Sequence, residues 1–304
     1  MNYQNIVVLG GTGFIGKQIV LKLINLGKNV KVITRQLPTQ QLTYASQAEY
    51  VKCDVYNEQQ LIQCLDGTDA VINLIGILNS DNDAPYGKAF AKTHVALPAL
   101  IISICKKLSI KRLLHMSALN ASLSAPSMYL RSRAEGERLV RQAQLNNQLL
   151  TTIYRPSIVY GPNDHLLNTF SKLQTYLPII PLACAHARFQ PIHVNDVAQA
   201  FINTLDKPQA IGKIYELGGP TVYTLKEIMS LVGQAKGRSR MIISLPQQVA
   251  YYQAMIFEKL PGQLITRDNL KSMSVDSTLS KTLDSELNIS PVILDDVIKT
   301  CLLH

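Results

Sequence analysis

Tryptophan, paired cysteines and clustered metal-ligand residues are missing from this chain of 304 residues. Its five cysteines (Cys53, Cys64, Cys105, Cys184 and Cys301) are scattered without a C-x-x-C pair, and its six histidines lack the spacing of metal ligands. These absences favour a reducing compartment and argue against a metal cluster, so we expect no metal site.

Long apolar runs are absent as well. The longest, residues 70–78, is interrupted by Asn73 and is far shorter than the roughly 20 residues that span a bilayer. The chain begins almost directly on a predicted strand, without a basic and then apolar leader, which argues against a secretory signal. We therefore expect a cytoplasmic protein, either free or held peripherally on the inner face of a membrane.

Charge is the strongest bias in the composition. Thirty lysines and arginines outnumber 21 aspartates and glutamates, giving a net charge of +9. A phosphorylated cofactor, an acidic protein or anionic membrane surface, and a nucleic acid would each suit this charge. The basic residues are spread out and are not interleaved with aromatic residues, so no nucleic-acid partner is expected.

The most informative stretch is residues 5–16, Asn-Ile-Val-Val-Leu-Gly-Gly-Thr-Gly-Phe-Ile-Gly. A run of aliphatic residues ends in glycines, and apolar residues at helical spacing follow at Ile19, Val20, Leu23 and Ile24. This order predicts a buried strand, a tight turn and a helix N-terminus, where glycines leave room for a phosphate and unpaired N–H groups attract it. The alternative is a purely structural β–α turn, but such a turn rarely needs four glycines.

Strands and helices alternate through the first half of the chain. Strands with little polar alternation are predicted at residues 5–9, 30–34, 50–53, 69–74, 112–117 and 152–156. Helices are predicted after the glycine turn and at residues 57–65, about 85–108 and 127–145. Buried parallel strands separated by helices indicate an α/β fold with a Rossmann-type, doubly wound parallel sheet.

The pattern changes after Tyr160, where turn residues and prolines interrupt the chain. An extended segment is predicted at residues 188–194. Asn195 or Asp196 is expected to cap the helix that continues to Leu205.

The same change of pattern suggests two regions. Residues 1–160 are expected to form an NAD(P)-binding Rossmann domain, with sheet contributions from about residues 186–220. Residues 161–185 and 221–304 are expected to form a smaller C-terminal substrate or partner region.

Several motifs follow one another in order over roughly residues 1–220. They are Gly10, Gly13 and Gly16 with G-x-x-G-x-x-G spacing, Asp54-Val55, residues 73–76, Ser117, Tyr129 with Arg133, Arg155-Pro156, and residues 192–198. This series resembles the short-chain dehydrogenase/reductase family in its atypical or extended form, which includes the NAD-dependent epimerase/dehydratase-like proteins. The resemblance implies a nicotinamide dinucleotide cofactor.

A second group of segments carries a narrower resemblance: residues 127–137, 164–168, 188–191 and 215–220, with 266–268 and 275–276 near the end. These segments are similar to the dehydrogenase-like accessory subunit of respiratory complex I and its bacterial relatives. Members of that group bind NADP(H) or NAD(H); some are non-catalytic subunits and others are linked to ubiquinone synthesis. The resemblance thus implies either a hydrophobic, quinone-like substrate or a place in a protein complex.

The resemblance also assigns residues to the cofactor. The backbone of the glycine turn would hold the pyrophosphate, and the other positions would contact the adenine, ribose or nicotinamide. The set is Gly10, Gly11, Thr12, Gly13, Phe14, Ile15, Gly16, Arg35, Asp54, Val55, Leu74, Ile75, Gly76, His94, Tyr129, Arg133, Arg155 and Pro156.

Three of these assignments have a plain alternative. Arg35 closes the second predicted strand, where an acid would bind the 2′-hydroxyl of NAD(H) and an arginine suits the 2′-phosphate of NADP(H). It therefore favours NADP(H), with NAD(H) as the alternative. The plain alternative is that Arg35 is an ordinary surface residue. Asp54 either accepts from the adenine amino group or is a turn acid. His94 either bonds a backbone carbonyl near the fifth strand or is a satisfied core residue.

Ser117, Tyr129 and Arg133 take the positions of the family's catalytic residues. In active relatives the Tyr is the general acid or base, the Ser polarises the substrate oxygen, and a Lys four residues after the Tyr lowers its pKa. Here that Lys is Arg133, which keeps the charge but is forked and effectively never deprotonates. The chain is then either an oxidoreductase or isomerase, or a nucleotide-binding accessory protein without turnover.

Residues 245–262 predict an apolar helix with tyrosines, bracketed by prolines. The helix is either an ordinary packed helix, a lid, a docking face for a partner, or an interfacial membrane helix. Together with the positive net charge, it motivates the hypothesis of peripheral contact with an anionic membrane.

Overall fold

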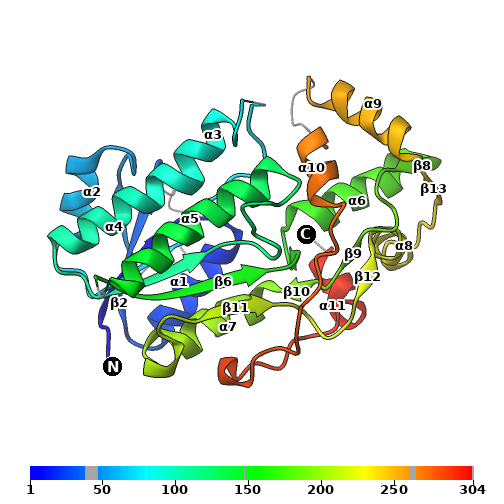
Figure 1. Ribbon diagram of the computed structural model, residues 1–304. Coiled ribbons are helices and arrows are strands. Elements are labelled where there is room, and N and C mark those ends of the chain that lie inside the picture. The colour runs from blue at the N-terminus through cyan, green and yellow to red at the C-terminus, as the bar shows by residue number, and fades with distance from the viewer. Residues whose placement is uncertain (38–46, 82, 147, 260–264, 303–304) are drawn as a thin grey trace.

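Seven parallel strands form the main sheet of the computed structural model, in the order β11-β6-β5-β4-β1-β2-β3 (Figure 1). They are β1 (Asn5–Leu9), β2 (Asn29–Thr34), β3 (Glu49–Lys52), β4 (Ala70–Asn73), β5 (Arg112–Met116), β6 (Leu150–Pro156) and β11 (Ile214–Leu217). The structure describes residues 1–37, 47–81, 83–146, 148–259 and 265–302. The strand order reverses between β1 and β4, as in a doubly wound sheet, so the predicted Rossmann-type α/β class is confirmed.

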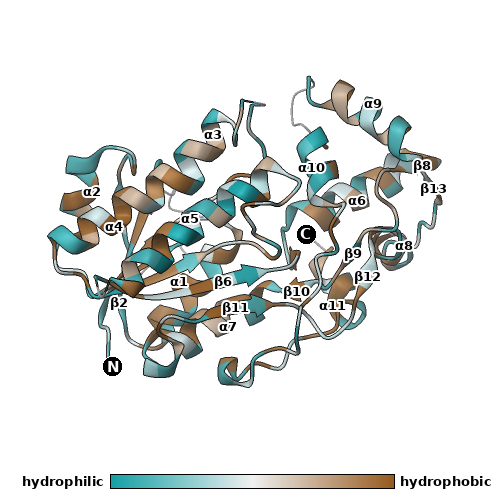
Figure 2. Ribbon diagram, viewed as in Figure 1, coloured by the Kyte–Doolittle hydropathy of each residue, from teal (hydrophilic) through white to brown (hydrophobic). Residues whose placement is uncertain are grey.

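Helices cover both faces of this sheet. On one face lie α1 (Phe14–Asn25) and α7 (Val194–Leu205); on the other lie α2 (Glu58–Leu65), α4 (Leu97–Lys107) and α5 (Met128–Leu145) (Figure 1). Apolar residues of both helix layers pack against the sheet. The strands and these helices carry many of the hydrophobic, brown segments in Figure 2. Burial on both faces explains why these strands read as nearly continuous apolar runs.

The helix predicted at about 85–108 is one continuous helix in three parts. It starts with α3 (Lys88–Phe90), passes through a π-helical turn (Ala91–Ala96) and ends as α4. By length and composition alone, Lys88–Lys107 is the one helix in the described residues that could cross a membrane. In this structure its residues Leu97, Ile101 and Ile104 are buried in the core against the sheet.

Many of the remaining elements gather around a third apolar core. Three short strand pairs form there: β7 (Val159–Tyr160) with β10 (Ile192–His193), β9 (Arg188–Phe189) with β12 (Tyr223–Thr224), and β8 (Ile179–Leu182) with β13 (Met241–Ser244). The helices are α6 (His165–Tyr176), α8 (Leu225–Ala235), α9 (Gln247–Phe257), α10 (Arg267–Ser272) and α11 (Leu294–Cys301), with 3₁₀ turns at Pro208–Ala210 and Ser285–Leu287.

The expected cap of α7 is wrong. The helix begins at Val194, and its N-cap is His193, whose ring accepts a hydrogen bond from the N–H of Asn195 (3.3 Å). Strand β10 therefore runs directly into α7, and neither Asn195 nor Asp196 stands at the cap. The carboxylate of Asp196 instead accepts from the N–H of Val292 (3.1 Å).

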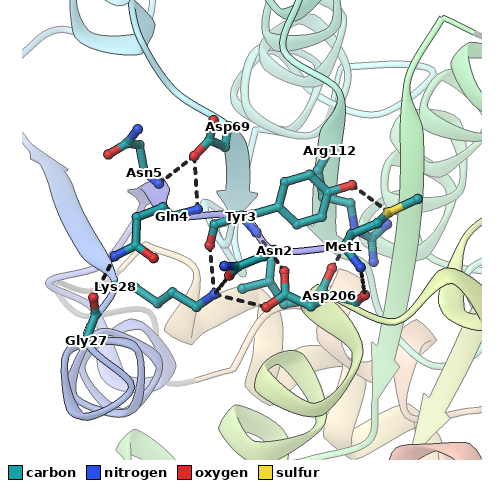
Figure 3. A network of polar contacts seen from close by, with 11 residues as sticks. Met1, Asn2, Tyr3, Gln4, Asn5, Gly27, Lys28, Asp69, Arg112 and Asp206 are labelled. Carbon is teal, nitrogen blue, oxygen red and sulfur yellow. Dashed lines mark hydrogen bonds and ion pairs between the residues drawn. The ribbon is translucent and has the colours of Figure 1, made fainter.

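A polar network fastens the start of the chain at the amino ends of the strands (Figure 3). The carboxylate of Asp206, at the end of α7, accepts from the N–H of Tyr3 (2.8 Å) and from the Nζ of Lys28 (3.0 Å). The amino group of Met1 donates to the Asp206 carbonyl (3.2 Å). This network lies at the opposite edge of the sheet from the carboxyl ends of the strands, where the glycine turn begins.

Candidate functional site

The turn between β1 and α1 is made of glycines because its backbone leaves no room for side chains. Gly10 has φ of +84°, and a Cβ on Gly16 would lie 2.2 Å from the Gly10 carbonyl oxygen. Gly13 caps α1 without a side-chain hydrogen bond, and the first turn of α1, which includes Phe14 and Ile15, has no acidic residue. The positive end of the helix dipole is thus left to an outside anion, an arrangement that binds phosphate.

Three residues predicted to contact the adenosine half of the cofactor follow β2 and β3 at the same edge of the sheet. Arg35 comes directly after β2 and is exposed, and Asp54 and Val55 come soon after β3. The carboxylate of Asp54 accepts from the N–H of Tyr56 (3.0 Å), which is the bond of a turn acid. Val55 is buried. The topology therefore puts these positions beside the glycine turn, as a dinucleotide site of this type requires.

The loop after β4 lies against the glycine turn and against Arg133. A Cβ on Gly10 would be 3.4 Å from the backbone of Leu74 and Ile75. A Cβ on Gly76 would be 1.9 Å from Nη2 of Arg133. Glycine at position 76 is therefore what allows the guanidinium to lie on this loop.

Arg133 is a buried cation without a carboxylate partner. It is 7% exposed, its Nη1 donates to the carbonyl of Met116 (3.2 Å), and its guanidinium carbon lies 5.4 Å from the centre of the Tyr129 ring. Among the described residues, no carboxylate forms an ion pair with it. Neither its Nε nor the buried Oγ of Ser117 has a hydrogen-bond partner there.

Buried polar groups without partners are costly and rare. A polar or anionic ligand that reached Oγ of Ser117 or Nε of Arg133 would supply the missing partner. Ser117 follows the end of β5, and Tyr129 and Arg133 share one face of α5. These are the three residues that the sequence predicts to be catalytic.

His115 belongs to the same site and was missed from the sequence, where it reads as one more residue of an apolar strand. Its Nδ1 lies 3.2 Å from Nδ2 of Asn73, whose Oδ1 accepts from the N–H of Ile75 (3.2 Å). Burial first, and then the charge of Arg133, lowers the pKa of His115 to about 3. A neutral ring therefore accepts at Nδ1 from the amide of Asn73 and helps to hold the loop after β4.

His94 is buried, at 2% exposure, and its ring bonds a backbone N–H of the loop after β4 and not a carbonyl. Its Nε2 accepts from the N–H of Ile77 (3.1 Å), and its Nδ1 lies 2.8 Å from Oγ of Ser132, which donates to the carbonyl of Tyr129 (2.7 Å). Burial first, and then the charge of Arg133, holds the pKa of His94 far below its usual value. Both ring nitrogens are thus used inside the protein, so His94 joins the loop after β4 to the turn of Tyr129 and offers no nitrogen to a cofactor.

Arg155 has a partner inside the protein that the sequence did not reveal. Its guanidinium forms a bidentate ion pair with Glu137 of α5, at 2.8 and 2.5 Å, and Glu137 is 3% exposed. Pro156 pairs with Leu217 where β6 meets β11. The arginine therefore fastens α5 to β6, and this partner was invisible in the sequence because the two residues lie 18 positions apart on different elements.

A doubly wound sheet with a glycine turn at its switch point defines the class as a nucleotide-binding protein of Rossmann type. The model of the NAD dependent epimerase/dehydratase family matches residues 6–218. The chain belongs to this family, which confirms the expected family resemblance.

Three known proteins illustrate what this chain is similar to. The chain is 26% identical over 299 residues to "NADH dehydrogenase [ubiquinone] 1 alpha subcomplex subunit 9, mitochondrial" of Mus musculus, covering 95% of this chain and 77% of that protein. It is 25% identical to the "Ceramide reductase" of Caulobacter vibrioides, covering 79% and 73%. Its fold is that of UDP-glucose 4-epimerase from Thermotoga maritima, with a TM-score of 0.75 over 98% of this chain and 97% of that one, at 18% identity.

Stability should fall with acid because His94 and His115 are held neutral. Their pKa values in the folded protein lie below the ordinary 6.5, so the unfolded chain takes up protons first. The stabilisation is present above about pH 6.5 and is lost below it, by up to about 1.4 kcal/mol per pH unit for each ring. His94→Gln removes one of the two rings and should reduce this slope by about half.

Urea unfolding at two pH values, on either side of 6.5, measures the effect in the wild type and the variant. An identical pH dependence in the two proteins would contradict the buried, neutral state of His94.

Proposed function

We propose that the protein binds a nicotinamide dinucleotide across the carboxyl edge of the sheet. The glycine turn takes the pyrophosphate, and the nicotinamide lies near Ser117 and Tyr129. The observation that carries this proposal is the pair of buried, unpartnered groups, Oγ of Ser117 and Nε of Arg133, beside a turn prepared for phosphate. Residues 1–160 supply this site in the proposal, and residues 161–185 and 221–304 form the substrate or partner region.

NADP(H) is the proposed form of the cofactor. Arg35 stands after β2, where the 2′ position of the adenine ribose lies in dinucleotide sites of this type. It is exposed at the end of a strand and carries a permanent charge, so it can form charge-assisted hydrogen bonds with a 2′-phosphate.

An accessory role, with binding but without turnover, is the proposed use of the cofactor. The Arg133 guanidinium is held by the Met116 carbonyl and lies against Gly76. It does not release its proton, so it cannot pass one along a relay as a lysine can. Similarity to a subunit of a respiratory complex supports a place in a protein complex.

Turnover of a hydrophobic, quinone-like or lipid substrate is the second candidate. Ser117 favours it, because its buried hydroxyl has no partner among the described residues and is available to a carbonyl oxygen. Tyr129 lies on α5 four positions before a cation, as in active relatives. Similarity to a ceramide reductase supports a substrate of lipid type.

Helix α9 is the proposed contact with a membrane surface. Its Val249, Tyr251, Tyr252 and Ile256 are all more than 40% exposed. Residues 236–272 contain six lysines and arginines against one glutamate and one aspartate. Exposed apolar and aromatic side chains with basic neighbours are suited to the headgroup region of an anionic bilayer.

Arg35→Ala should weaken NADPH binding about tenfold or more and leave NADH binding nearly unchanged, because only the 2′-phosphate loses a charged partner. Calorimetric titration of both coenzymes measures the change. Arg238→Ala, which removes an exposed arginine beyond α8, is the control and should bind both like the wild type. Absence of binding to the folded wild type would overturn the dinucleotide proposal; a preference for NADH would overturn only the phosphate contact.

Arg133→Lys separates the two candidate functions. In an accessory protein, NADPH oxidation with quinones and hydrophobic carbonyls stays at background in the wild type and in this variant. A gain of turnover in Arg133→Lys, or turnover in the wild type that Tyr129→Phe abolishes, would establish the enzyme instead.

Tyr252→Glu with Ile256→Glu should lower co-sedimentation with anionic vesicles about tenfold, because two exposed side chains proposed to enter the membrane surface are replaced by charges that this surface repels. Leu145→Glu is the matched control, since this leucine of α5 is 76% exposed but lies on another helix. Equal sedimentation of all three proteins would exclude α9 as the membrane contact.

A further inference from the structure

Asp268 reaches from α10 to the first turn of α5, 140 positions earlier in the chain. Its carboxylate accepts from the N–H of Met128 (2.7 Å) and from the N–H of Tyr129 (2.9 Å). The side chain is 7% exposed. A residue of the C-terminal segment thus caps the helix that carries the predicted catalytic tyrosine.

These bonds complete the hydrogen bonding of that helix end. The N-cap Ser127 accepts from the N–H of Leu130 (3.1 Å), and the N–H of Arg131 donates to the Ser127 carbonyl (3.1 Å). The N–H groups of Met128 and Tyr129 are the two that Ser127 leaves without an acceptor, and Asp268 takes both. A carboxylate at a helix N-terminus also interacts favourably with the helix dipole.

Other hydrogen bonds and an ion pair hold Asp268 in this position. Thr266 and Asn269 form a reciprocal capping box that fixes the start of α10. Arg267 pairs with Glu258 at the end of α9 (2.9 Å). The side chain of Asn269 donates to the carbonyl of Leu78 (3.4 Å), in the segment that follows Gly76. Helix α10 therefore joins α9, the segment after β4 and α5 (Figure 1).

We infer that Asp268 is a positioning residue that sets the α5 turn of Tyr129 and so couples the C-terminal segment to the dinucleotide site. Both of its oxygens accept backbone hydrogen bonds, so it acts through the backbone of Met128 and Tyr129. The next turn of α5 carries Arg133, whose guanidinium lies near the Tyr129 ring. This inference rests on the proposed dinucleotide site.

The coupling must act in both directions. If holding α10 in place favours the geometry that binds the dinucleotide, then the bound dinucleotide stabilises α10 to the same extent. Amides of residues 266–272 should therefore exchange hydrogen more slowly in the protein with NADPH than without it.

Three variants of the full chain test the inference. Asp268→Asn keeps the shape and one acceptor, Asp268→Ala removes both, and Asp206→Asn removes a carboxylate at the opposite edge of the sheet (Figure 3). Hydrogen exchange measured without cofactor should be about tenfold faster at residues 128–130 in Asp268→Ala than in the wild type, and unchanged there in Asp206→Asn. NADPH binding should weaken about fivefold or more in Asp268→Asn, and not in Asp206→Asn.

The possible outcomes distinguish failure of the proposed function from failure of the proposed coupling. A folded wild type that binds neither NADPH nor NADH would overturn the proposed function. A wild type that binds NADPH, with Asp268→Asn binding as tightly as Asp206→Asn, would overturn the coupling. Unchanged exchange at residues 128–130 in Asp268→Asn and Asp268→Ala would do the same; should the alanine variant not fold, the asparagine variant decides.

Discussion

The burial of an arginine without a carboxylate partner is the constraint on which the candidate site depends. Arg133 is nearly inaccessible, and its charge helps to keep His94 and His115 neutral by lowering their pKa values. Its guanidinium lies so close to the loop after β4 that a Cβ at position 76 would displace it. A carboxylate of the protein would have neutralised the cation, and its absence among the described residues leaves a positive site beside a helix N-terminus that also attracts anions. Both features suit a phosphate-containing ligand better than a neutral one.

Contacts from several parts of the chain meet on helix α5, which carries Tyr129 and Arg133. A Cβ on its Gly136 would lie 2.0 Å from the carbonyl of His94, so the helix approaches the π-helical turn more closely than a side chain would permit. Glu137 ties its middle to Arg155 of β6, and Asp268 closes its first turn. Each bond comes from a different part of the chain. The position of Tyr129 therefore depends on contacts from other parts of the chain as well as on the local bonds of Ser127 and Ser132.

This difference explains what could be predicted from the sequence. Periodicity and glycine spacing are local, and they were enough for the order of strands and helices in the first half of the chain and for the turn at Gly10. The family followed from a resemblance carried by motifs in order along the chain. Asp268 was visible only as part of a resemblance, because nothing local links it to Met128. His115 is hidden in a strand pattern, and the pairing of Arg155 with Glu137 depends on how β6 meets α5. The capping of α7 by His193 was missed because Asn and Asp are the commoner caps and a strand that passes straight into a helix leaves no signal of its own.

The same contacts link the exposed helix α9 to the candidate site. Glu258 directly follows α9 and pairs with Arg267. The residue after Arg267 is Asp268, whose carboxylate accepts from the N–H of Tyr129. A partner or bilayer that orders α9 would also order α10, since the ion pair joins them. Order in α10 in turn favours the α5 geometry that the dinucleotide needs, so docking and cofactor binding would strengthen each other by the same free energy. This coupling would be useful to an accessory protein without any turnover, because a bound dinucleotide would then indicate that the docking face is assembled.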